Sequence, residues 1–133
     1  MMLSQGDQGE YSAIAWLGQT QAVVLVPLGN CSDYDVATEI DGRLVKVQVK
    51  TSRQQLGDGR YGVTLCTREG NQSWNRIVKR FSPERCDYLF VHTAGGRRWF
   101  IPSAKVEGTT SIVLGGPKYA EYEVDPGPPL TLS

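Results

Sequence analysis

The chain has 133 residues, no net charge at pH 7, 40% apolar residues and 9% aromatic residues. This size and composition suit one domain with one hydrophobic core, and they exclude wholesale disorder. The longest apolar run, residues 22–26, is too short to cross a bilayer, and we expect no secretory leader and no membrane segment. Three cysteines without CxxC spacing and a single histidine argue against structural zinc and against a His-rich metal site, and they favour a reducing compartment such as the cytoplasm.

The first third of the chain predicts a helix, a strand and a hairpin. Ser4 is a suitable cap for a helix over residues 5–19, along which apolar residues recur every three or four positions. Residues 22–26 predict a buried strand, which Pro27 ends. Residues 34–40 and 43–50 alternate in polarity around Asp41-Gly42, which is a strong two-residue hairpin signal.

The remaining expected elements are short and mostly extended. They are a turn at 57–59, a strand over 60–67, an irregular or weakly helical stretch over 68–80, a hairpin of 86–92 with 97–101, a helical turn at 103–106, and strands at 112–114 and 119–124. Residues 126–133 are rich in proline, and we expect them to form a loose tail. The sequence therefore predicts one domain over residues 1–125 followed by this tail.

The neutral total charge conceals three segments of different sign. Residues 1–42 carry six acids and no Lys or Arg, residues 43–105 carry thirteen bases and four acids, and residues 106–133 carry four acids and one lysine. The basic middle segment is compatible with binding a polyanion. The plainer interpretation, which charge alone favours, is a set of solvated faces that balance one another once the chain has folded.

The register of the first hairpin brings polar residues onto one face. If Ile40 pairs with Arg43 across the turn, Asp35 lies opposite Gln48, and Lys50 shares their face two residues further on. Opposed side chains are about 5 Å apart, which allows an acid, an amide and an ammonium group to converge on one ligand. The plainer interpretation is an amphipathic hairpin whose polar face is in water.

Glu10 in a helix, Asp35 in a strand and Gln48-Val49-Lys50 in the partner strand resemble the PD-(D/E)XK nuclease superfamily. The Gln-x-Lys form is most similar to the small branch of group I intron-encoded homing endonucleases, and more distantly to archaeal Holliday junction resolvases. The chain departs from the wider pattern at Tyr34, where the superfamily has Pro, and at Gln48, where it has an acid. The resemblance implies an α/β fold with a restriction-endonuclease-like core: a mixed central sheet, an N-terminal helix and additional β-hairpins.

The resemblance also implies Mg²⁺-dependent hydrolysis of phosphodiester bonds in double-stranded DNA, with Mn²⁺ as a possible substitute. Asp35 and the Val49 carbonyl would bind the metal, and Gln48 would hold the metal or its water. Glu10 would act through a water, while Lys50 would orient the attacking water. His92 is expected to be a structural residue of its strand.

Residues outside this set could hold DNA or join two copies of the chain. Candidate contacts to DNA phosphates surround the expected site or lie in the basic segment: Lys46, Ser52, Arg53, Arg76, Lys79 and Arg80. Because one site cuts one strand, cleavage of a duplex favours a homodimer or homotetramer, with Tyr88, Phe90, Trp99, Phe100 and Trp74 as candidate interface aromatics. The alternative is that these aromatics fill the core of the monomer, which we favour for Phe90, Phe100 and Trp74. Two alternatives are a catalytically inactive nucleic-acid-binding protein of the same fold and a protein-binding scaffold.

Overall fold

A computed structural model describes residues 5–20, 22–29, 33–65, 67–69, 77–79, 81 and 83–131. Its elements, in chain order, are α1 (Gln5–Gln19), β1 (Val23–Leu25), β2 (Val36–Ile40), β3 (Arg43–Ser52), β4 (Tyr61–Thr64), β5 (Thr67–Glu69), β6 (Ile77–Lys79), β7 (Tyr88–Thr93), β8 (Arg98–Pro102), the 3-10 turn η1 (Ser103–Lys105), β9 (Ser111–Leu114), the 3-10 turn η2 (Ala120–Tyr122) and β10 (Glu123–Val124). The helix expected over residues 5–19 is confirmed, whereas its expected cap, Ser4, lies outside the described residues. No helix in the described part of the chain is both long and apolar enough to cross a membrane.

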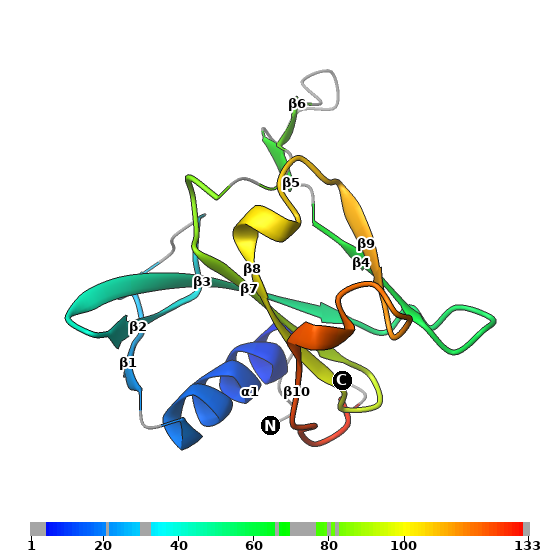
Figure 1. Cartoon of the computed structure of the whole chain (residues 1–133), viewed down its shortest axis with the longest axis horizontal. Helices are drawn as coiled ribbons and strands as arrows, with labels where there is room; N and C mark the ends of the chain where they lie inside the picture. Colours follow the sequence, from blue (N-terminus) through cyan, green and yellow to red (C-terminus); the bar gives the residue numbers. More distant parts are fainter. Residues whose placement is uncertain are drawn as a thin grey trace.

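The centre of the fold is a mixed six-stranded sheet (Figure 1), in the order β1-β2-β3-β7-β8-β10. The β3–β7 pair is parallel, and the other neighbours in this sheet are antiparallel. Two short ribbons, β4–β9 and β5–β6, lie outside it. The predicted mixed sheet with an N-terminal helix and additional hairpins is therefore confirmed.

The β2–β3 hairpin has the predicted turn and register. Asp41 and Gly42 both have positive φ, at 51° and 77°, as a two-residue turn compatible with strand twist requires. Ile40 pairs with Arg43 and Val36 pairs with Val47, so the register assumed from the sequence is the one observed.

Apolar layers cover the two faces of the sheet. On one face α1 packs with Ala13 against Val47 and Phe90. On the other face the side chains of β7 and β8, among them Leu89 and Trp99, form a larger core with the β4–β9 ribbon. Figure 1 shows α1 on one side of the sheet and β4 and β9 on the other. Strand β3, which passes between these layers, therefore has neighbours on both of its faces.

Three expectations about local structure were wrong. The strand at residues 23–25 is not buried, because it forms an edge of the sheet and leaves Val23 58% exposed. Part of the stretch expected to be irregular or helical is extended, since β5 pairs with β6 from Thr67↔Lys79 to Glu69↔Ile77. The C-terminal segment is not loose over its described residues, because backbone hydrogen bonds join Gly127 to Gly96 and Leu130 to Ala94.

Candidate active site

Asp35 lies directly before β2, at the point where the chain joins the hairpin ladder. Its backbone N–H donates to the Val47 carbonyl at 3.0 Å, and its Oδ2 accepts the Val49 N–H at 2.8 Å. The last β2–β3 ladder pair is Val36 with Val47, and beyond it the Asp35 carboxylate accepts the hydrogen bond from the Val49 N–H of β3. In an antiparallel ladder the N–H and C=O of one residue point to the same neighbouring strand, so the Val49 carbonyl points to the same side of β3 as Asp35.

Gln48 and Lys50 lie on one face of β3, with Val49 on the other. They are opposite Leu89 and Val91 of β7, whose side chains belong to the larger core, whereas Val49 packs with the smaller core under α1. Extending the observed register by one pair places Asp35 opposite Gln48, as the sequence predicts. Gln48 and Lys50 are both only partly buried, which leaves the amide and ammonium groups accessible to a ligand.

Glu10 approaches the site from the helix because its neighbour is a glycine. A Cβ atom on Gly9 would lie 2.3 Å from Cγ2 of Thr51 and 3.3 Å from Cγ1 of Val49. The first of these distances is shorter than side-chain packing permits, so only glycine lets the helix lie this close to β3. The Gly9-Glu10 pair noted in the sequence thus brings the Glu10 backbone to the strand that carries Val49.

The two carboxylates influence each other. Burial, followed by the negative charge of Asp35 and then of Asp7, raises the pKa of Glu10 above its usual value. Burial also raises the pKa of Asp35, although the Val49 N–H and the positive charge of Lys50 each lower it. Glu10, Asp35 and Lys50 are therefore close enough to interact electrostatically, while Gln48 is placed here by its strand position alone.

This set of atoms fits a hard cation. The described residues contain no group of three or more His, Cys, Asp or Glu that could hold a metal ion, so carboxylates alone would not complete a coordination sphere. Mg²⁺ binds through few protein oxygens and keeps several waters. Two carboxylates whose pKa values are raised by burial, and in Glu10 also by the charge of Asp35, lie next to a backbone carbonyl and the strand position of an amide, and this set suits such an ion.

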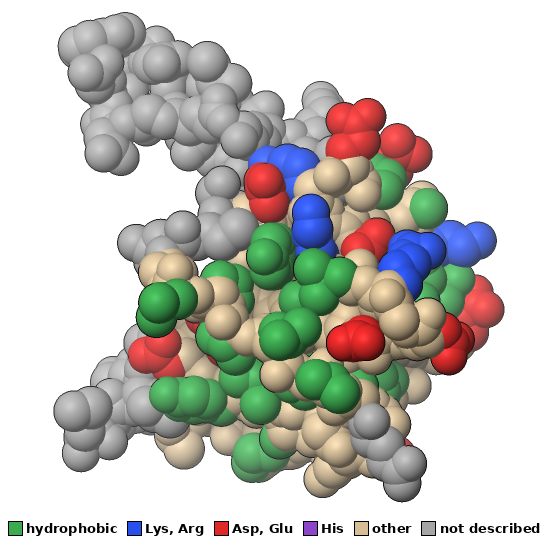
Figure 2. Space-filling view, turned by 90° about the vertical axis from the view of Figure 1, so that its left-hand side faces the viewer, with side chains coloured by type: hydrophobic (Ala, Val, Ile, Leu, Met, Phe, Trp, Pro, Cys, Tyr) green, Lys and Arg blue, Asp and Glu red, His purple; other side chains and the backbone are tan. Residues whose placement is uncertain are grey.

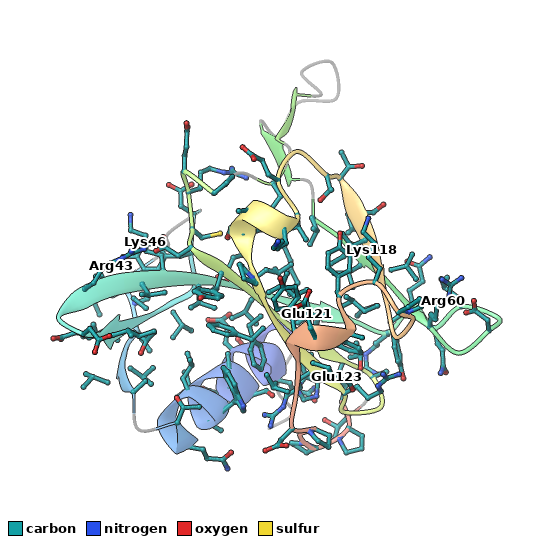
Figure 3. The ribbon with its side chains drawn as sticks, viewed as in Figure 1. Arg43, Lys46, Arg60, Lys118, Glu121 and Glu123 are labelled. Atoms are coloured by element: carbon teal, nitrogen blue, oxygen red, sulfur yellow. The ribbon has the colours of Figure 1, made fainter. Side chains whose placement is uncertain are left out.

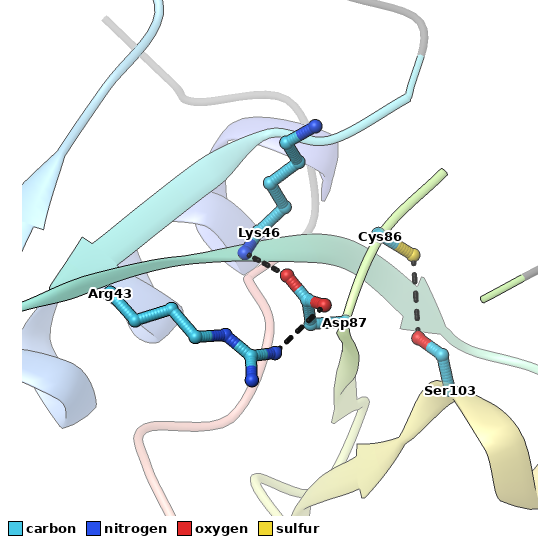
Figure 4. A network of polar contacts seen from close by, with 5 residues as sticks. All are labelled: Arg43, Lys46, Cys86, Asp87 and Ser103. Carbon is cyan, nitrogen blue, oxygen red and sulfur yellow. Dashed lines mark hydrogen bonds and ion pairs between the residues drawn. The ribbon is translucent and has the colours of Figure 1, made fainter. Parts of the chain in front are cut away.

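Asp87 is a residue that the sequence interpretation missed. Its Oδ2 accepts the Lys46 N–H at 2.9 Å, and its Oδ1 lies 3.5 Å from Nη2 of Arg43 (Figure 4). Asp87 precedes β7, and its own N–H donates to the Lys46 carbonyl at 2.8 Å. The parallel pairing of β3 with β7 creates this contact, and no local sequence signal specifies that pairing.

The residues expected to contact DNA fall into different environments. Lys46 is partly buried, and its Nζ lies 5.6 Å from the centroid of the Tyr34 ring. The Ser52 hydroxyl is buried and donates to the Gly62 carbonyl at 2.5 Å, which counts against a phosphate contact for this residue. Arg53 donates to the Thr131 carbonyl. Arg76, Arg80 and the candidate interface residue Trp74 lie outside the described residues, and Lys79 lies in β6.

The basic residues of the middle segment that the structure describes are spread over the molecule. Figure 3 shows Arg43 and Lys46 at one end of the molecule and Arg60 toward the other. Ion pairs join Arg43 to Asp87, Arg60 to Asp58 and Arg97 to Glu123. The interpretation of balanced, solvated charges therefore holds for these three arginines.

Comparisons with known proteins agree with this geometry. A family described as PD-(D/E)XK endonuclease matches residues 3–118. No curated protein matches significantly. Among solved structures, a bacterial homing endonuclease, I-Ssp6803I, superposes with a TM-score of 0.78 at 23% identity, over 90% of this chain and 86% of that one. MepB, at 13% identity over 85% of this chain and 95% of that one, has a TM-score of 0.48.

The family match covers most of the chain and includes the helix and hairpin that carry the five site positions. The likeness to the homing endonuclease extends over nearly the whole chain and confirms the restriction-endonuclease-like fold. The resemblance inferred from Glu10, Asp35 and Gln48-Val49-Lys50 is confirmed at the level of the superfamily. The chain belongs to the PD-(D/E)XK endonuclease family.

Proposed function

We propose that this protein is a Mg²⁺-dependent endodeoxyribonuclease that hydrolyses phosphodiester bonds in double-stranded DNA. The observation that carries the proposal is the bond from the Val49 N–H to the Asp35 carboxylate, at 2.8 Å. It fixes a partly exposed carboxylate beside the strand from which Gln48 and Lys50 project. The family is one of nucleases, which supports a nucleic-acid substrate.

Each residue has a role that follows from its chemistry and place. Asp35, the Val49 carbonyl, the Gln48 amide and, through a water, Glu10 are the groups that would hold the metal. Mg²⁺, when bound, supplies Lewis-acid activation of water and of a phosphoryl oxygen. The Lys50 ammonium, which interacts with Asp35, orients the attacking water and offsets negative charge that develops on the phosphate.

DNA would lie across the polar face of β3. Lys46, Gln48 and Lys50 are alternate residues of this strand and share a face, with about 6.7 Å between successive members. Lys46 is therefore the phosphate contact that the structure supports best. Arg53, Arg76, Lys79 and Arg80 remain further candidates, and Ser52 is withdrawn because its hydroxyl is engaged with Gly62.

Gln48 favours a second candidate function, that of a nucleic-acid-binding protein without catalytic activity. Gln48 adds no negative charge where the superfamily pattern has an acid, and this weakens the attraction for a cation. A catalytically inactive nucleic-acid-binding protein of the same fold would keep the basic groups and lose the metal. The two functions differ in whether a divalent cation binds and in whether DNA is cut.

A cleavage assay separates these alternatives. Supercoiled plasmid and a pool of randomised duplexes would be incubated with the protein in Mg²⁺, in Mn²⁺ and in EDTA, beside the Lys50→Ala variant. We expect cleavage by the wild-type protein in either metal, and none in EDTA or by the variant. DNA binding in all conditions without any cleavage would favour the inactive binding protein.

We also propose that the active form is a homodimer or homotetramer, because one site cuts one strand of a duplex. The aromatic residues Phe90 and Trp99 are fully buried in the monomer, so they do not provide the interface expected from the sequence. The edge strand β1 and the segment after it instead expose apolar side chains, namely Val23, Leu25, Val26 and Leu28, which we call the apolar edge. Figure 2 shows hydrophobic side chains gathered on one face of the molecule. An exposed edge strand with an apolar surface suits pairing with a second copy.

A further inference from the structure

The segment after β10 is fastened to the domain. Residues 126–131, which we call the C-terminal strap, donate two backbone hydrogen bonds to the turn between β7 and β8: Gly127 to Gly96 at 2.8 Å and Leu130 to Ala94 at 3.0 Å. The Leu130 side chain is buried. The strap therefore follows a defined path, and side-chain hydrogen bonds join its last described residue, Thr131, to α1.

A buried polar cluster holds the middle of the strap. The Pro128 carbonyl lies 2.8 Å from Nε2 of His92, while Nδ1 of the same ring lies 2.5 Å from the Ser12 hydroxyl. Arg98 Nη1 also donates to that hydroxyl oxygen, at 3.1 Å. Because the Pro128 carbonyl can only accept, Nε2 of His92 carries a proton, and burial lowers the pKa of His92, which favours the neutral ring with Nδ1 accepting from Ser12. His92 thus links the strap to α1 through Ser12.

The end of the strap is bound to the first turns of α1. Gln8 Nε2 donates to the Thr131 carbonyl at 3.1 Å, and the Thr131 N–H donates to Gln8 Oε1 at 2.8 Å. Arg53, the residue after β3, also donates to the Thr131 carbonyl. A single residue of the strap, Thr131, therefore joins the start of α1 to the end of β3.

These contacts adjoin the proposed active site on both sides. Gln8 is two residues before Glu10, and Arg53 is three residues after Lys50. Between them, Gly9 lies against Val49 and Thr51. The ends of helices fray readily, and Gln8 lies in the first turns of α1. Its two hydrogen bonds to Thr131 therefore oppose fraying of the turn that carries Glu10.

We propose that the C-terminal strap, through the paired hydrogen bonds of Gln8 and Thr131, is a positioning element that holds Glu10 toward Asp35. The proposal rests on the proposed nuclease function for its catalytic consequence. Its structural part concerns the metal-free protein and stands independently of that function. Gln8 and Thr131 touch neither substrate nor metal in this scheme, so they are positioning residues.

The test compares Gln8→Ala, which removes both bonds, with Gln19→Ala, the same change at the exposed other end of α1. Hydrogen–deuterium exchange of the amides of residues 9–12 would be measured on the metal-free proteins. We expect these amides to exchange at least fivefold faster in Gln8→Ala than in the wild type, and at the wild-type rate in Gln19→Ala. Equal exchange in Gln8→Ala and the wild type would overturn the proposal.

A second measurement follows the position of Glu10. Binding of Mn²⁺ would be titrated by calorimetry, and the Mg²⁺ concentration for half-maximal cleavage would be determined. In Gln8→Ala we expect both to shift to at least threefold higher metal concentration, with the affinity for duplex DNA in EDTA unchanged. Faster exchange without a shift in Mn²⁺ binding would overturn the positioning role. If the wild-type protein binds Mn²⁺ but cuts no DNA, the proposed function fails while this test remains valid.

A double variant tests whether the two residues act as a unit. Thr131→Pro removes the N–H that bonds to Gln8 Oε1 and keeps the carbonyl, while it also restricts the backbone at this position. Because Gln8→Ala already abolishes that bond, adding Thr131→Pro should not increase the exchange rate of residues 9–12 further. An additive increase would show that Thr131 acts through other contacts and would contradict the pairing proposed here.

Discussion

Asp35 and Asp87 bond to β3 from its two sides. Asp35 Oδ2 accepts the Val49 N–H on the β2 side, and Asp87 Oδ2 accepts the Lys46 N–H on the β7 side. Each of the two residues lies directly before a strand, Asp35 before β2 and Asp87 before β7, and its carboxylate bonds to the β3 backbone near the point where pairing with that strand begins. Gln48 lies between the two bonded positions, so its backbone is constrained from both sides.

The first prediction concerns the carboxylate of Asp35 and the ammonium group of Lys50, to which we assign metal binding and orientation of the attacking water. Asp35→Asn and Lys50→Ala should abolish cleavage and leave the fold intact, because both side chains are partly exposed and their loss opens no cavity in the core. Because the folded-state pKa of Asp35 is raised, its charged form opposes folding at neutral pH, and Asp35→Asn should not lower Tm in metal-free buffer. Glu39→Gln, an exposed acid of the same hairpin, is the matched control and should cleave normally. Wild-type cleavage by either site variant would refute the assignment.

The second prediction concerns the amide in the signature. Gln48→Glu adds a negative charge at the proposed metal site and should lower the Kd for Mn²⁺ by about tenfold, which corresponds to about 1.4 kcal/mol. Isothermal titration at constant pH and ionic strength measures this directly. Cleavage could change in either direction because a tighter ligand also slows exchange, so the decisive quantity is affinity. An unchanged Kd would place Gln48 outside the metal's coordination sphere.

The third prediction uses two glycines of the same helix. Gly9→Ala forces a Cβ against Thr51 and Val49, which displaces the start of α1, and it should lower the cleavage rate by about 100-fold. Gly18→Ala meets no atom within 4 Å and should raise the free energy of unfolding by about 0.5–1 kcal/mol without changing cleavage. Thermal melts and cleavage rates of the two variants would be compared. Equal cleavage by both would show that the close approach at Gly9 has no part in placing Glu10.

The fourth prediction concerns pH. Burial, with a smaller contribution from the positive charge of Arg98, lowers the pKa of His92 from its usual 6.5, although its bond to Pro128 opposes this. The unfolded chain therefore takes up this proton at higher pH than the folded protein does. The contribution of neutral His92 to the free energy of unfolding is therefore complete above pH 6.5. Below that pH the free energy of unfolding decreases, by up to about 1.4 kcal/mol per pH unit.

His92→Gln should reduce this dependence, since the glutamine amide does not titrate. The measurement is the difference in Tm between pH 7.5 and pH 5.5 for the two proteins. Carboxylates that titrate in this range do so in both proteins, so the comparison isolates the histidine. The same fall in Tm for the variant would contradict the prediction.

The fifth prediction concerns assembly. Leu25→Asp places a charge on the apolar edge, and light scattering at micromolar concentration should then report the 14.7 kDa monomer, where the wild type gives a dimer or tetramer. Val113→Asp, on the exposed face of the β4–β9 ribbon, is the matched control and should leave the oligomer intact. A monomeric wild-type protein that linearises plasmid would contradict the proposal.

The sequence predicted the parts of the site that local chemistry specifies. Asp41-Gly42 determines the turn, the turn determines the register, and the register places Asp35 opposite Gln48. The contribution of Asp87 was not predictable in this way, because it depends on the parallel pairing of strands about forty residues apart. Such pairing follows from the packing of the whole sheet and leaves no short-range signal.

The exposure of β1 and the contacts of the C-terminal strap also could not be predicted from the local sequence pattern. The apolar run at Val23–Leu25 has the composition of an interior strand, yet its place at the edge of the sheet exposes it. The Pro-rich composition of the strap predicted a loose tail, whereas Pro128 supplies a carbonyl to a buried histidine. In both cases the environment was set by elements distant in sequence.

The local hairpin has a consequence for the order of folding. Asp35, Gln48, Val49 and Lys50 lie within 16 consecutive residues, joined by a two-residue turn, so these four can assemble as soon as that hairpin closes. The other neighbour of β3 is β7, which is separated from it by residues 53–87, so we expect the β3–β7 pairing to form more slowly than the hairpin. Apart from β4 and the neighbouring residues that pack into the larger core, the intervening stretch connects the two strands, and longer connections cost little free energy to close. Insertions and substitutions there can therefore accumulate during evolution and diversify the surface without moving the four residues.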